Sequence, residues 1–522
     1  MPEEQWTKVA DEDELAEGKP ISVEVGDDQI MLVRVNGRIH ACGDKCTHYG
    51  GPLSKGLLVG ETVTCPWHTA RFDVTTGDVQ APPALTGVGC CPVKVEEGSV
   101  YVGEVRKPKA PTVKGADDRT FAIVGAGGAG NAAAITLREE GFAGRIVMIT
   151  AEPHRPYDRP TLSKELMSGE ASVKSLPLHS EKFYERRRIE LLTNALVTGL
   201  DADARKVILQ DGREIAFDRA LLATGGVPRR LDIPGAELPS FFVLRSRDDA
   251  QAIVSAVQEA ERAVVLGAGF IGMEAAASLT ERGLQVHVVA PEDVPMVRVF
   301  GRRVGGWVRG LHEEHGVEFH MGTTAREVRG DGGVEEIVLE DGTSLPADVV
   351  IAGIGIRPAV SYLEGSGLLQ DGAVPVDGKL CTRADGIYAA GDIAVVPDAR
   401  TGKACRVEHW VVAERQGCHA ARAMLGSEEP YDEVPFFWTL QFHNSLKYIG
   451  HAGDADDVVF RGSLPDGKFL AGYYEGEQLR AIAAAGPARA ALAVSELLRA
   501  RRNVSREQFA DASVDLVRLL AG

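Results

Sequence analysis

The chain lacks the features that send a protein across or into a membrane. Among its 522 residues, no continuous apolar run reaches the roughly 18 residues that a transmembrane helix needs. The N-terminal stretch, through the acidic residues 11–14, has neither the basic nor the apolar region of a signal peptide. The eight cysteines show no spacing typical of a disulfide framework. We therefore expect a protein of the cytoplasm.

Positive charge is also scarce. The chain has 57 Lys and Arg residues against 75 Asp and Glu residues, which gives a formal net charge of −18. Nucleic acid and anionic membranes both attract a cationic surface, so neither is an expected partner. With 44% apolar residues, the chain is long enough for three or four domains with cores of their own.

Two pairs of cysteine and histidine occur near the N-terminus, with the spacings C-x-H and C-x-x-H: Cys46 with His48, and Cys65 with His68. In a Rieske [2Fe–2S] cluster, two thiolates hold one iron and two neutral imidazoles hold the other. The spacings let each of two loop tips supply one sulfur and one nitrogen. We therefore predict that these four residues bind such a cluster. A tetrahedral zinc site is the alternative that the same residue types allow.

The stretch closely resembles the ligand loops of Rieske ferredoxins. Gly51 and Trp67 stand where high-potential Rieske proteins carry a disulfide between these loops, so this bridge cannot form. The hydroxyl donors that follow the second ligand histidine in that class are missing as well, because His68 is followed by Thr69, Ala70, Arg71 and Phe72. With fewer hydrogen bonds to the cluster sulfurs, we expect a potential toward the negative end of the Rieske range. The nearby His40 and Cys42 are interpreted as ordinary strand residues.

The sequence around these pairs predicts a small β domain. Residues 20–105 form short segments rich in β-branched residues, with a hairpin signal at Asn36-Gly37. Residues 106–118 are polar, contain proline and have no periodicity, which is typical of a linker. The first domain is therefore placed at 1–105.

Two copies of a G-x-G-x-x-G turn follow, each between a buried strand and the start of a helix. The turns consist of Gly125, Gly127 and Gly130, and of Gly267, Gly269 and Gly272. This spacing brings the backbone close to a pyrophosphate at the helix N-terminus. Each copy is followed by a meander with an Asp-Gly turn and a strand that ends in glycine, at Gly225 and Gly355. The duplication predicts FAD in the first unit and a nicotinamide cofactor in the second, whereas a single turn could serve packing alone.

Acidic residues near the strand ends bear on the two nucleotides. Glu152 follows the second strand of the first unit, where an acid would accept from a ribose hydroxyl. In the second unit Glu292 is displaced by two residues. NADH is therefore only slightly favoured, and NADPH is the alternative, with phosphate partners among Arg298, Arg302 and Arg303. Asp392, after the strand ending Ala-Ala-Gly, would accept from a flavin ribityl hydroxyl or cap a helix.

Six motifs together identify a family. They are Gly125-x-Gly127-x-x-Gly130, Arg159-Pro-Thr-Leu-Ser-Lys164, Ala223-Thr-Gly-Gly226, Gly267-x-Gly269-x-x-Gly272 with Glu274 beyond it, Ala390-Gly-Asp392 and Glu408-His-Trp410. Residues 119–520 resemble the two-dinucleotide flavoprotein reductases of the putidaredoxin reductase and apoptosis-inducing factor type. With its N-terminal module, the whole chain resembles an apoptosis-inducing factor-like fusion.

The resemblance implies a multidomain fold. An all-β Rieske domain precedes an α/β flavoprotein of the glutathione reductase-like type, with two dinucleotide-binding domains, and a small α+β C-terminal domain. The implied FAD-binding domain covers 119–244 and 366–429, and the NAD(P)-binding domain covers 245–365. A C-terminal lid domain, which often supports dimers, covers 430–522, so a monomer or a homodimer is expected.

The resemblance also assigns roles to single residues. Lys164 would lie beside flavin N5 and meet Glu274, which would hold the nicotinamide carboxamide, so both are expected to be catalytic. Trp410 would pack near the flavin, and Trp438 would come from the lid domain. For the lysine and the glutamate, the alternative is an ordinary surface charge; for the two tryptophans, it is core packing. The other implied cofactor-binding residues are Arg159, Val197, Thr224, Gly225 and Gly355.

The expected function is electron transfer. The stretch from Thr150 to Ser180 has no cysteine, which excludes the thiol chemistry of related disulfide reductases. NAD(P)H would give two electrons to FAD, and the cluster would pass them on singly to an outside protein or small molecule, such as an oxygenase or a cytochrome. His48 and His68, at an exposed tip, would be the edge at which electrons enter or leave. The alternatives are a redox-sensing interaction protein with slow turnover and a module related to the Rieske-type part of assimilatory nitrite reductases.

Overall fold

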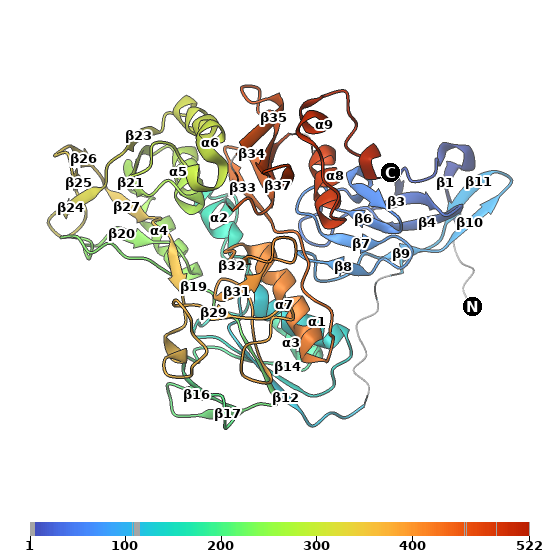
Figure 1. The fold of residues 1–522 in the computed structure, drawn as a ribbon, viewed down its shortest axis with the longest axis horizontal. Helices are drawn as coiled ribbons and strands as arrows, with labels where there is room; N and C mark the ends of the chain where they lie inside the picture. Colours follow the sequence, from blue (N-terminus) through green and yellow to red (C-terminus); the bar gives the residue numbers. More distant parts are fainter. Residues whose placement is uncertain are drawn as a thin grey trace.

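The computed structural model describes residues 6–106, 108, 115–453, 455, 457–486 and 488–520. Most of the linker predicted at 106–118 lies outside these residues. Figure 1 shows the C-terminal part of the chain (red) between the N-terminal module (blue) and the second nucleotide-binding unit (green), with the first unit below them. The helices within the described ranges are all too short or too polar to cross a membrane.

The N-terminal module consists of three antiparallel sheets. Their strand orders are β1(Thr7–Asp11)-β11(Ser99–Val102)-β10(Val93–Glu96), β2(Ile21–Val25)-β3(Asp28–Val35)-β4(Arg38–Gly43)-β9(Cys90–Cys91) and β5(Leu57–Val59)-β6(Thr62–Thr64)-β7(Arg71–Asp73)-β8(Val79–Ala81). Asn36 and Gly37 join β3 to β4 with φ values of 52° and 72°, the left-handed conformation that a tight hairpin turn requires. The predicted hairpin is thus confirmed, and His40 and Cys42 lie within β4 as expected.

The first nucleotide-binding unit has a five-stranded parallel sheet. Its strand order is β14(Ile189–Leu192)-β13(Arg145–Ile149)-β12(Thr120–Val124)-β18(Arg219–Leu222)-β30(Ile387–Ala389). Helices α1(Gly128–Glu139) and α7(Trp410–Met424) pack against each other on it, and α3(Glu181–Arg186) precedes β14. The predicted meander is the antiparallel sheet β15(Val197–Asp201)-β16(Lys206–Leu209)-β17(Glu214–Ala216). A small sheet, β29(Val374–Pro375)-β31(Ala394–Pro397)-β32(Ala404–Cys405), completes the unit.

The second unit repeats this arrangement. Its parallel sheet has the order β20(Phe241–Val243)-β27(Val349–Ala352)-β21(Arg262–Leu266)-β22(Gln285–Ala290)-β23(Glu318–Met321), and its meander is β24(Ala325–Arg329)-β25(Glu336–Leu339)-β26(Ser344–Pro346). The helices are α4(Arg247–Ala256), α5(Phe270–Glu281) and α6(Val297–Glu314). The strands after the two glycine-ended strands, β19(Gly226–Pro228) and β28(Ile356–Pro358), pair with each other and so join the units.

The C-terminal domain touches every other part of the chain. Its antiparallel sheet has the order β33(Phe436–Gln441)-β34(Asn444–Gly450)-β37(Gln478–Ala485)-β36(Lys468–Glu475)-β35(Asp457–Ser463), with α8(Ala488–Arg499) and α9(Arg506–Ala510) against it. The helices pack on a core that also includes Leu57 of the N-terminal module. The short helix α2(Glu165–Ser168) of the first unit packs against α5 of the second.

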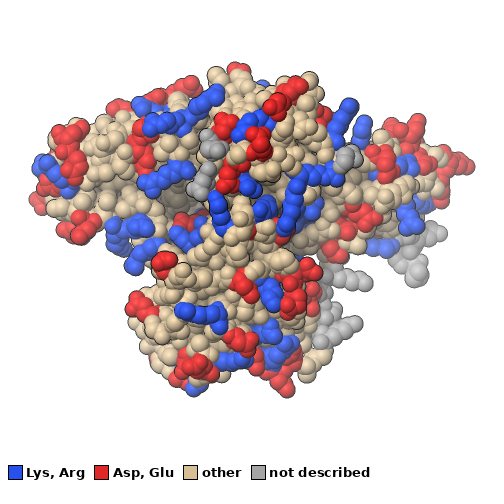
Figure 2. Space-filling view, in the orientation of Figure 1, with Lys and Arg blue, Asp and Glu red and all other residues tan. Residues whose placement is uncertain are grey.

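Buried polar contacts fix the N-terminal module in place. Arg415 on α7 is buried and donates to the carbonyl of Val434 at 2.8 Å and to the hydroxyl of Thr69 at 3.0 Å. Arg71 pairs with Glu433 at 2.5 Å. The two terminal nitrogens of Arg415 thus have acceptors on either side of the boundary between the N-terminal module and the rest of the chain, and these directional contacts favour one orientation of the module. On the visible face of the molecule, acidic and basic side chains are interspersed (Figure 2).

Candidate functional site

The four predicted cluster ligands converge at one end of the N-terminal module. Nδ1 of His48 lies 3.1 Å from Nδ1 of His68, and the Cys46 and Cys65 thiols are buried beside each other. Metal–imidazole bonds of about 2.0–2.1 Å place two nitrogens on one tetrahedral ion about 3.3 Å apart. The donor set, two sulfurs on one side and two facing nitrogens on the other, therefore fits a Rieske [2Fe–2S] cluster.

The loops that carry these ligands pack too closely for a side chain at Gly51. A Cβ atom there would lie 2.9 Å from Cys65 Sγ and 3.1 Å from the ring of Trp67. Gly51 and Trp67 thus face each other, as the two residues of a bridge between the loops would. Packing of the indole against glycine takes the place of that covalent link.

The expectation that the two histidines form an exposed tip is wrong. Both rings are partly buried, because β33 of the C-terminal domain covers them. The centroid of the Trp438 ring lies 4.0 Å from that of His68 and 6.3 Å from that of His48. Trp438, expected from the lid domain, therefore packs directly on the ligand rings.

Tyr49 forms a second contact between the ligand loops and the first nucleotide-binding unit. Its hydroxyl donates to the carboxylate of the buried Asp158 and lies 3.0 Å from the hydroxyl of Thr161. Lys164 follows three residues after Thr161. The cluster end of the N-terminal module thus faces the segment in which the sequence places a catalytic lysine.

The surroundings of the ligand histidines keep them neutral. Burial lowers the pKa of His48 to about 4. Burial, followed by the charges of His48, Lys447 and Lys164, holds the pKa of His68 well below its usual range. Lys447 also donates to the carbonyl of Pro66 at 2.6 Å. Neutral imidazoles are the form that ligates iron.

The structure brings the two predicted catalytic residues together. Lys164 Nζ lies 2.8 Å from Glu274 Oε2, and both side chains are buried. Ser163 donates to the same oxygen at 2.5 Å, and Thr439 donates to Oε1 at 2.6 Å. Because every carboxylate oxygen has a partner, the pair tolerates its burial. The first unit, α5 and β33 meet at this point.

A second network joins several of the predicted flavin-binding residues. Arg159 pairs with Glu152 and donates to the Arg245 carbonyl at 2.8 Å, and Arg245 in turn lies 3.0 Å from Asp392. Burial raises the pKa of Glu152, but the charge of Arg159 and a hydrogen bond from Tyr157 outweigh this effect and lower it. Glu152 is therefore an ionised acceptor.

The same region corrects one alternative and reveals residues that the sequence did not. Asp392 lies two residues before the start of β31, so it does not cap a helix. Arg245 and Tyr157 were not predicted because neither lies in a recognisable motif. Asp158 precedes the Arg159 motif and could have been found only through its neighbours.

The first glycine turn shows which of its glycines serve packing. A Cβ atom on Gly125 would lie 2.1 Å from the carbonyl of Ala223, and one on Gly130 would lie 1.9 Å from the carbonyl of Gly125. A Cβ atom on Gly127 would meet no protein atom within 4 Å. Packing thus explains the outer two glycines and leaves the middle one unexplained.

The second turn has the same property. Cβ atoms on Gly267 and Gly272 would lie 2.6 Å and 2.0 Å from the carbonyls of Gly353 and Gly267, whereas Gly269 has no neighbour within 4 Å. The open space at Gly127 and Gly269 adjoins the N-termini of α1 and α5, where a pyrophosphate would bind. Both units therefore fit a dinucleotide.

The remaining predicted residues occupy the margins of these sites. Thr224 donates to the carbonyl of Ala359 at 2.7 Å, and Gly355 accepts from the amide of Arg229 at 2.9 Å. Val197 begins β15, three residues after Asn194, whose amide donates to the carbonyl of Glu152 at 3.1 Å. Trp410 begins α7 and packs beside Gly128 at the N-terminus of α1.

The acid and the arginines of the second unit are already paired. Glu292 contacts Arg298 at 2.9 Å, and Arg302 contacts Asp293. The guanidinium of Arg303 lies 3.8 Å from the centroid of the Phe460 ring. All three arginines considered as phosphate partners are thus engaged within the protein.

Comparison with known families assigns the chain. Pyridine nucleotide-disulphide oxidoreductases match residues 119–417, which is more than half of the chain. The chain belongs to this family. The Rieske [2Fe–2S] domain matches residues 5–92, and the reductase C-terminal domain matches residues 436–520.

The chain is similar to some relatives along most of its length and to others along about three quarters of it. It is 38% identical to apoptosis-inducing factor 3 of Homo sapiens over 95% of this chain and 84% of that protein. It is 36% identical to the ferredoxin reductase component of chlorobenzene dioxygenase from Cupriavidus sp. (strain PS12), over 77% of this chain and 98% of that protein. The structure of the covalent putidaredoxin reductase–putidaredoxin complex matches with a TM-score of 0.75 and 32% identity, covering 78% and 99% of the two chains.

These findings confirm the predicted fold class, enzyme class and cofactors. This protein is an NAD(P)H-dependent FAD oxidoreductase with a Rieske [2Fe–2S] domain, and it works in electron transfer.

The open space at Gly269 leads to a prediction. In Gly269→Ala, the methyl group occupies the space beside the α5 N-terminus, so the KM for NADH should rise by about tenfold or more. The free energy of unfolding should change by about 1 kcal/mol or less, since no protein atom is displaced. FAD should stay bound. Steady-state kinetics and thermal melts provide both values.

Gly306→Ala is the matched control, because Gly306 lies in α6 of the same unit and also has open space around its Cβ position. It should leave the KM unchanged. An unchanged KM in Gly269→Ala as well would show that the dinucleotide binds elsewhere.

Proposed function

We propose that this protein carries electrons from NADH, by way of FAD in the first nucleotide-binding unit, to its own Rieske cluster and then to an outside acceptor. When bound, FAD takes up a hydride from the nicotinamide, and the cluster takes up single electrons. The observation that carries the proposal is the packing of Trp438 on the ligand ring of His68. It places the cluster ligands against the reductase part of the same chain.

Two protein segments connect the cluster ligands to the Lys164–Glu274 pair. One is β33, in which Trp438 contacts His68 while the next residue, Thr439, donates to Glu274. The other is the segment from Asp158, which holds Tyr49, to Lys164. Because the two segments are rigidly packed, the distance between flavin and cluster is fixed by the fold.

Lys164 and Glu274 act at the nicotinamide in this proposal. The Lys164 ammonium stabilises negative charge that develops on the flavin during hydride transfer. Glu274 positions the lysine, and its carboxylate lies on α5 of the second unit, from which it reaches the nicotinamide carboxamide. Their common burial strengthens both electrostatic effects.

NADH is the proposed reductant. Discrimination in favour of NADPH requires a free arginine for the 2′-phosphate. Arg298, Arg302 and Arg303 each have an acidic or aromatic partner, and Glu292 presents a negative charge near the end of β22. This arrangement supports a preference for NADH.

Electrons would leave the cluster on the side of Trp67. Trp67 lies between Cys65 and His68, and its side chain is 45% exposed. We therefore place the contact with the acceptor at Trp67. The loops lack a covalent bridge, which favours a cluster of negative potential. An oxygenase that accepts electrons from ferredoxins, or a cytochrome, fits such a cluster and the exposed aromatic residue beside it.

Two tryptophan variants test the direction of the relay. In Trp438→Leu, stopped-flow reduction of the cluster by NADH should slow by about tenfold or more, whereas bleaching of the flavin should keep its rate. Trp67→Leu, which changes the exposed indole of the residue before His68, is the matched control. It should leave reduction of the cluster unchanged and slow only its reoxidation by an added cytochrome. Equal effects of the two variants on cluster reduction would refute the proposed path.

A lysine variant tests the hydride step. Lys164→Met should slow flavin bleaching by NADH by about 100-fold, because a preorganised charge is lost. Lys174→Met, an exposed lysine of the same unit, should have no effect. Lys164→Met leaves the Glu274 carboxylate without its cation, and the double variant Lys164→Met/Glu274→Gln removes that buried charge. If the double variant retains FAD, its slow bleaching reflects lost catalysis and not misfolding. Flavin bleaching at the normal rate in the double variant would contradict the role of Lys164 in hydride transfer.

A further inference from the structure

The outer edge of the second nucleotide-binding unit holds a group of ligating side chains that the electron path does not use. β23 is the edge strand of the sheet and pairs in parallel with β22, with His287 opposite Glu318 and Val289 opposite His320. Side chains alternate along a strand, so His287, Glu318 and His320 project from the same face. His287 and His320 lie within their strands, and Glu318 is the first residue of β23.

The distances within this group match a metal site. His287 Nδ1 lies 3.2 Å from His320 Nε2 and 3.6 Å from Glu318 Oε2. Three ligand atoms, one from each residue, lie within 4.8 Å of one another. With bonds of about 2.0–2.1 Å, a tetrahedral zinc ion holds its ligand atoms about 3.3 Å apart. Without an ion, the two imidazoles share a hydrogen bond.

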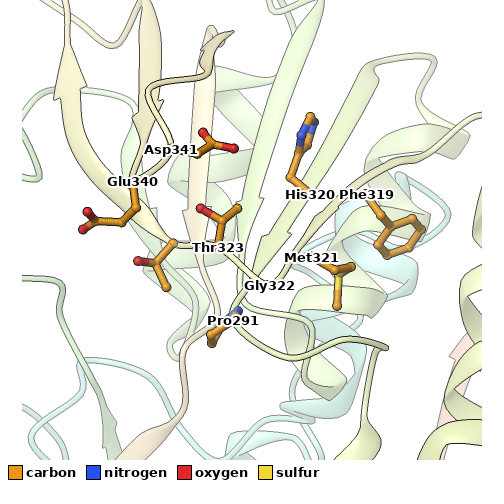
Figure 3. Close-up of a pocket in the computed structure, with 9 residues that line it drawn as sticks. Pro291, Phe319, His320, Met321, Gly322, Thr323, Glu340 and Asp341 are labelled. Carbon is orange, nitrogen blue, oxygen red and sulfur yellow. The ribbon is translucent and has the colours of Figure 1, made fainter.

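A pocket of about 620 Å³ is lined in part by His320. Figure 3 shows His320 and Asp341 in its upper part and Pro291 in its lower part. Glu340 and Asp341, at the turn after β25, add negative charge to the lining. Burial and the charge of His287 lower the pKa of His320, whereas Glu318 and Asp341 act to raise it, so an unprotonated ligand lies in a negative environment.

We propose that His287, Glu318 and His320 bind a divalent zinc-type ion, with one coordination position open to the pocket beside Asp341. Two imidazoles and one carboxylate with an open position are a common zinc donor set. Mg²⁺ and Ca²⁺ prefer oxygen ligands and fit the two imidazoles poorly. The high exposure of Glu318, whose side chain is 71% exposed, gives the ion a route from solvent.

The site is connected to the proposed dinucleotide site by backbone hydrogen bonds. Gly322, which lines the pocket after β23, donates to the carbonyls of Ala290 at 2.8 Å and Glu292 at 3.1 Å. An ion held between β22 and β23 would therefore stiffen the strand end that carries Glu292. Binding of the ion itself does not depend on the redox chemistry of the protein.

Zinc titration of the tag-free holoenzyme, loaded with FAD and cluster, tests the proposal. Competition with a chromophoric chelator should reveal a tight site in the wild type. Glu318→Gln and His320→Asn should each weaken it by about tenfold or more, since each removes a ligand. The exposed Glu318 can be changed without loss of folding, and flavin bleaching by NADH verifies that both variants are intact.

His443→Gln is the matched control. His443 is an exposed imidazole 3.6 Å from Glu281, and among the described residues it belongs to no group of three ligating side chains, so its loss should not change zinc affinity. Unchanged zinc affinity in Glu318→Gln and His320→Asn would overturn the proposal. Displacement of zinc by an equal concentration of Mg²⁺ would also overturn it, because it would indicate a simple acidic surface.

Discussion

The contact between the Trp438 ring and the His68 imidazole fixes the relation between the cluster ligands and the rest of the molecule. It is supported by buried polar contacts that a loosely tethered module would not have, such as that of Arg415 with Thr69. Lys447 adds a hydrogen bond to the loop between Cys65 and His68. In the proposed path, the encounter that separate reductases and ferredoxins need becomes a step within one chain, because these contacts hold the predicted donor and acceptor sites in one body.

β33 links the two chemical parts of the protein. Neighbouring residues of a strand point to opposite faces. Here Trp438 contacts the predicted cluster ligands, while Thr439 donates a hydrogen bond to the Glu274 carboxylate. The C-terminal domain therefore shapes both ends of the proposed electron path.

The sequence predicted well the features that depend on local spacing. The cysteine–histidine pairs, both glycine turns and the Asn36-Gly37 hairpin are short motifs whose geometry follows from a few neighbouring residues. It predicted poorly which surfaces pack together, because burial of His68 depends on Trp438, about 370 residues later in the chain. Asp158, Arg245 and Thr439 carry no periodic signal, and only the folded chain brings them to the site.

The central claim is that the cluster is reduced from within the same molecule. The most direct measurement follows cluster reduction after NADH mixing, under anaerobic conditions, as the protein concentration is varied at saturating NADH. An intramolecular path predicts a first-order rate constant that does not depend on protein concentration, together with loss of the oxidised cluster spectrum in every molecule that holds both cofactors. A rate that rises in proportion to protein concentration, or a cluster that stays oxidised while the flavin bleaches, would contradict it.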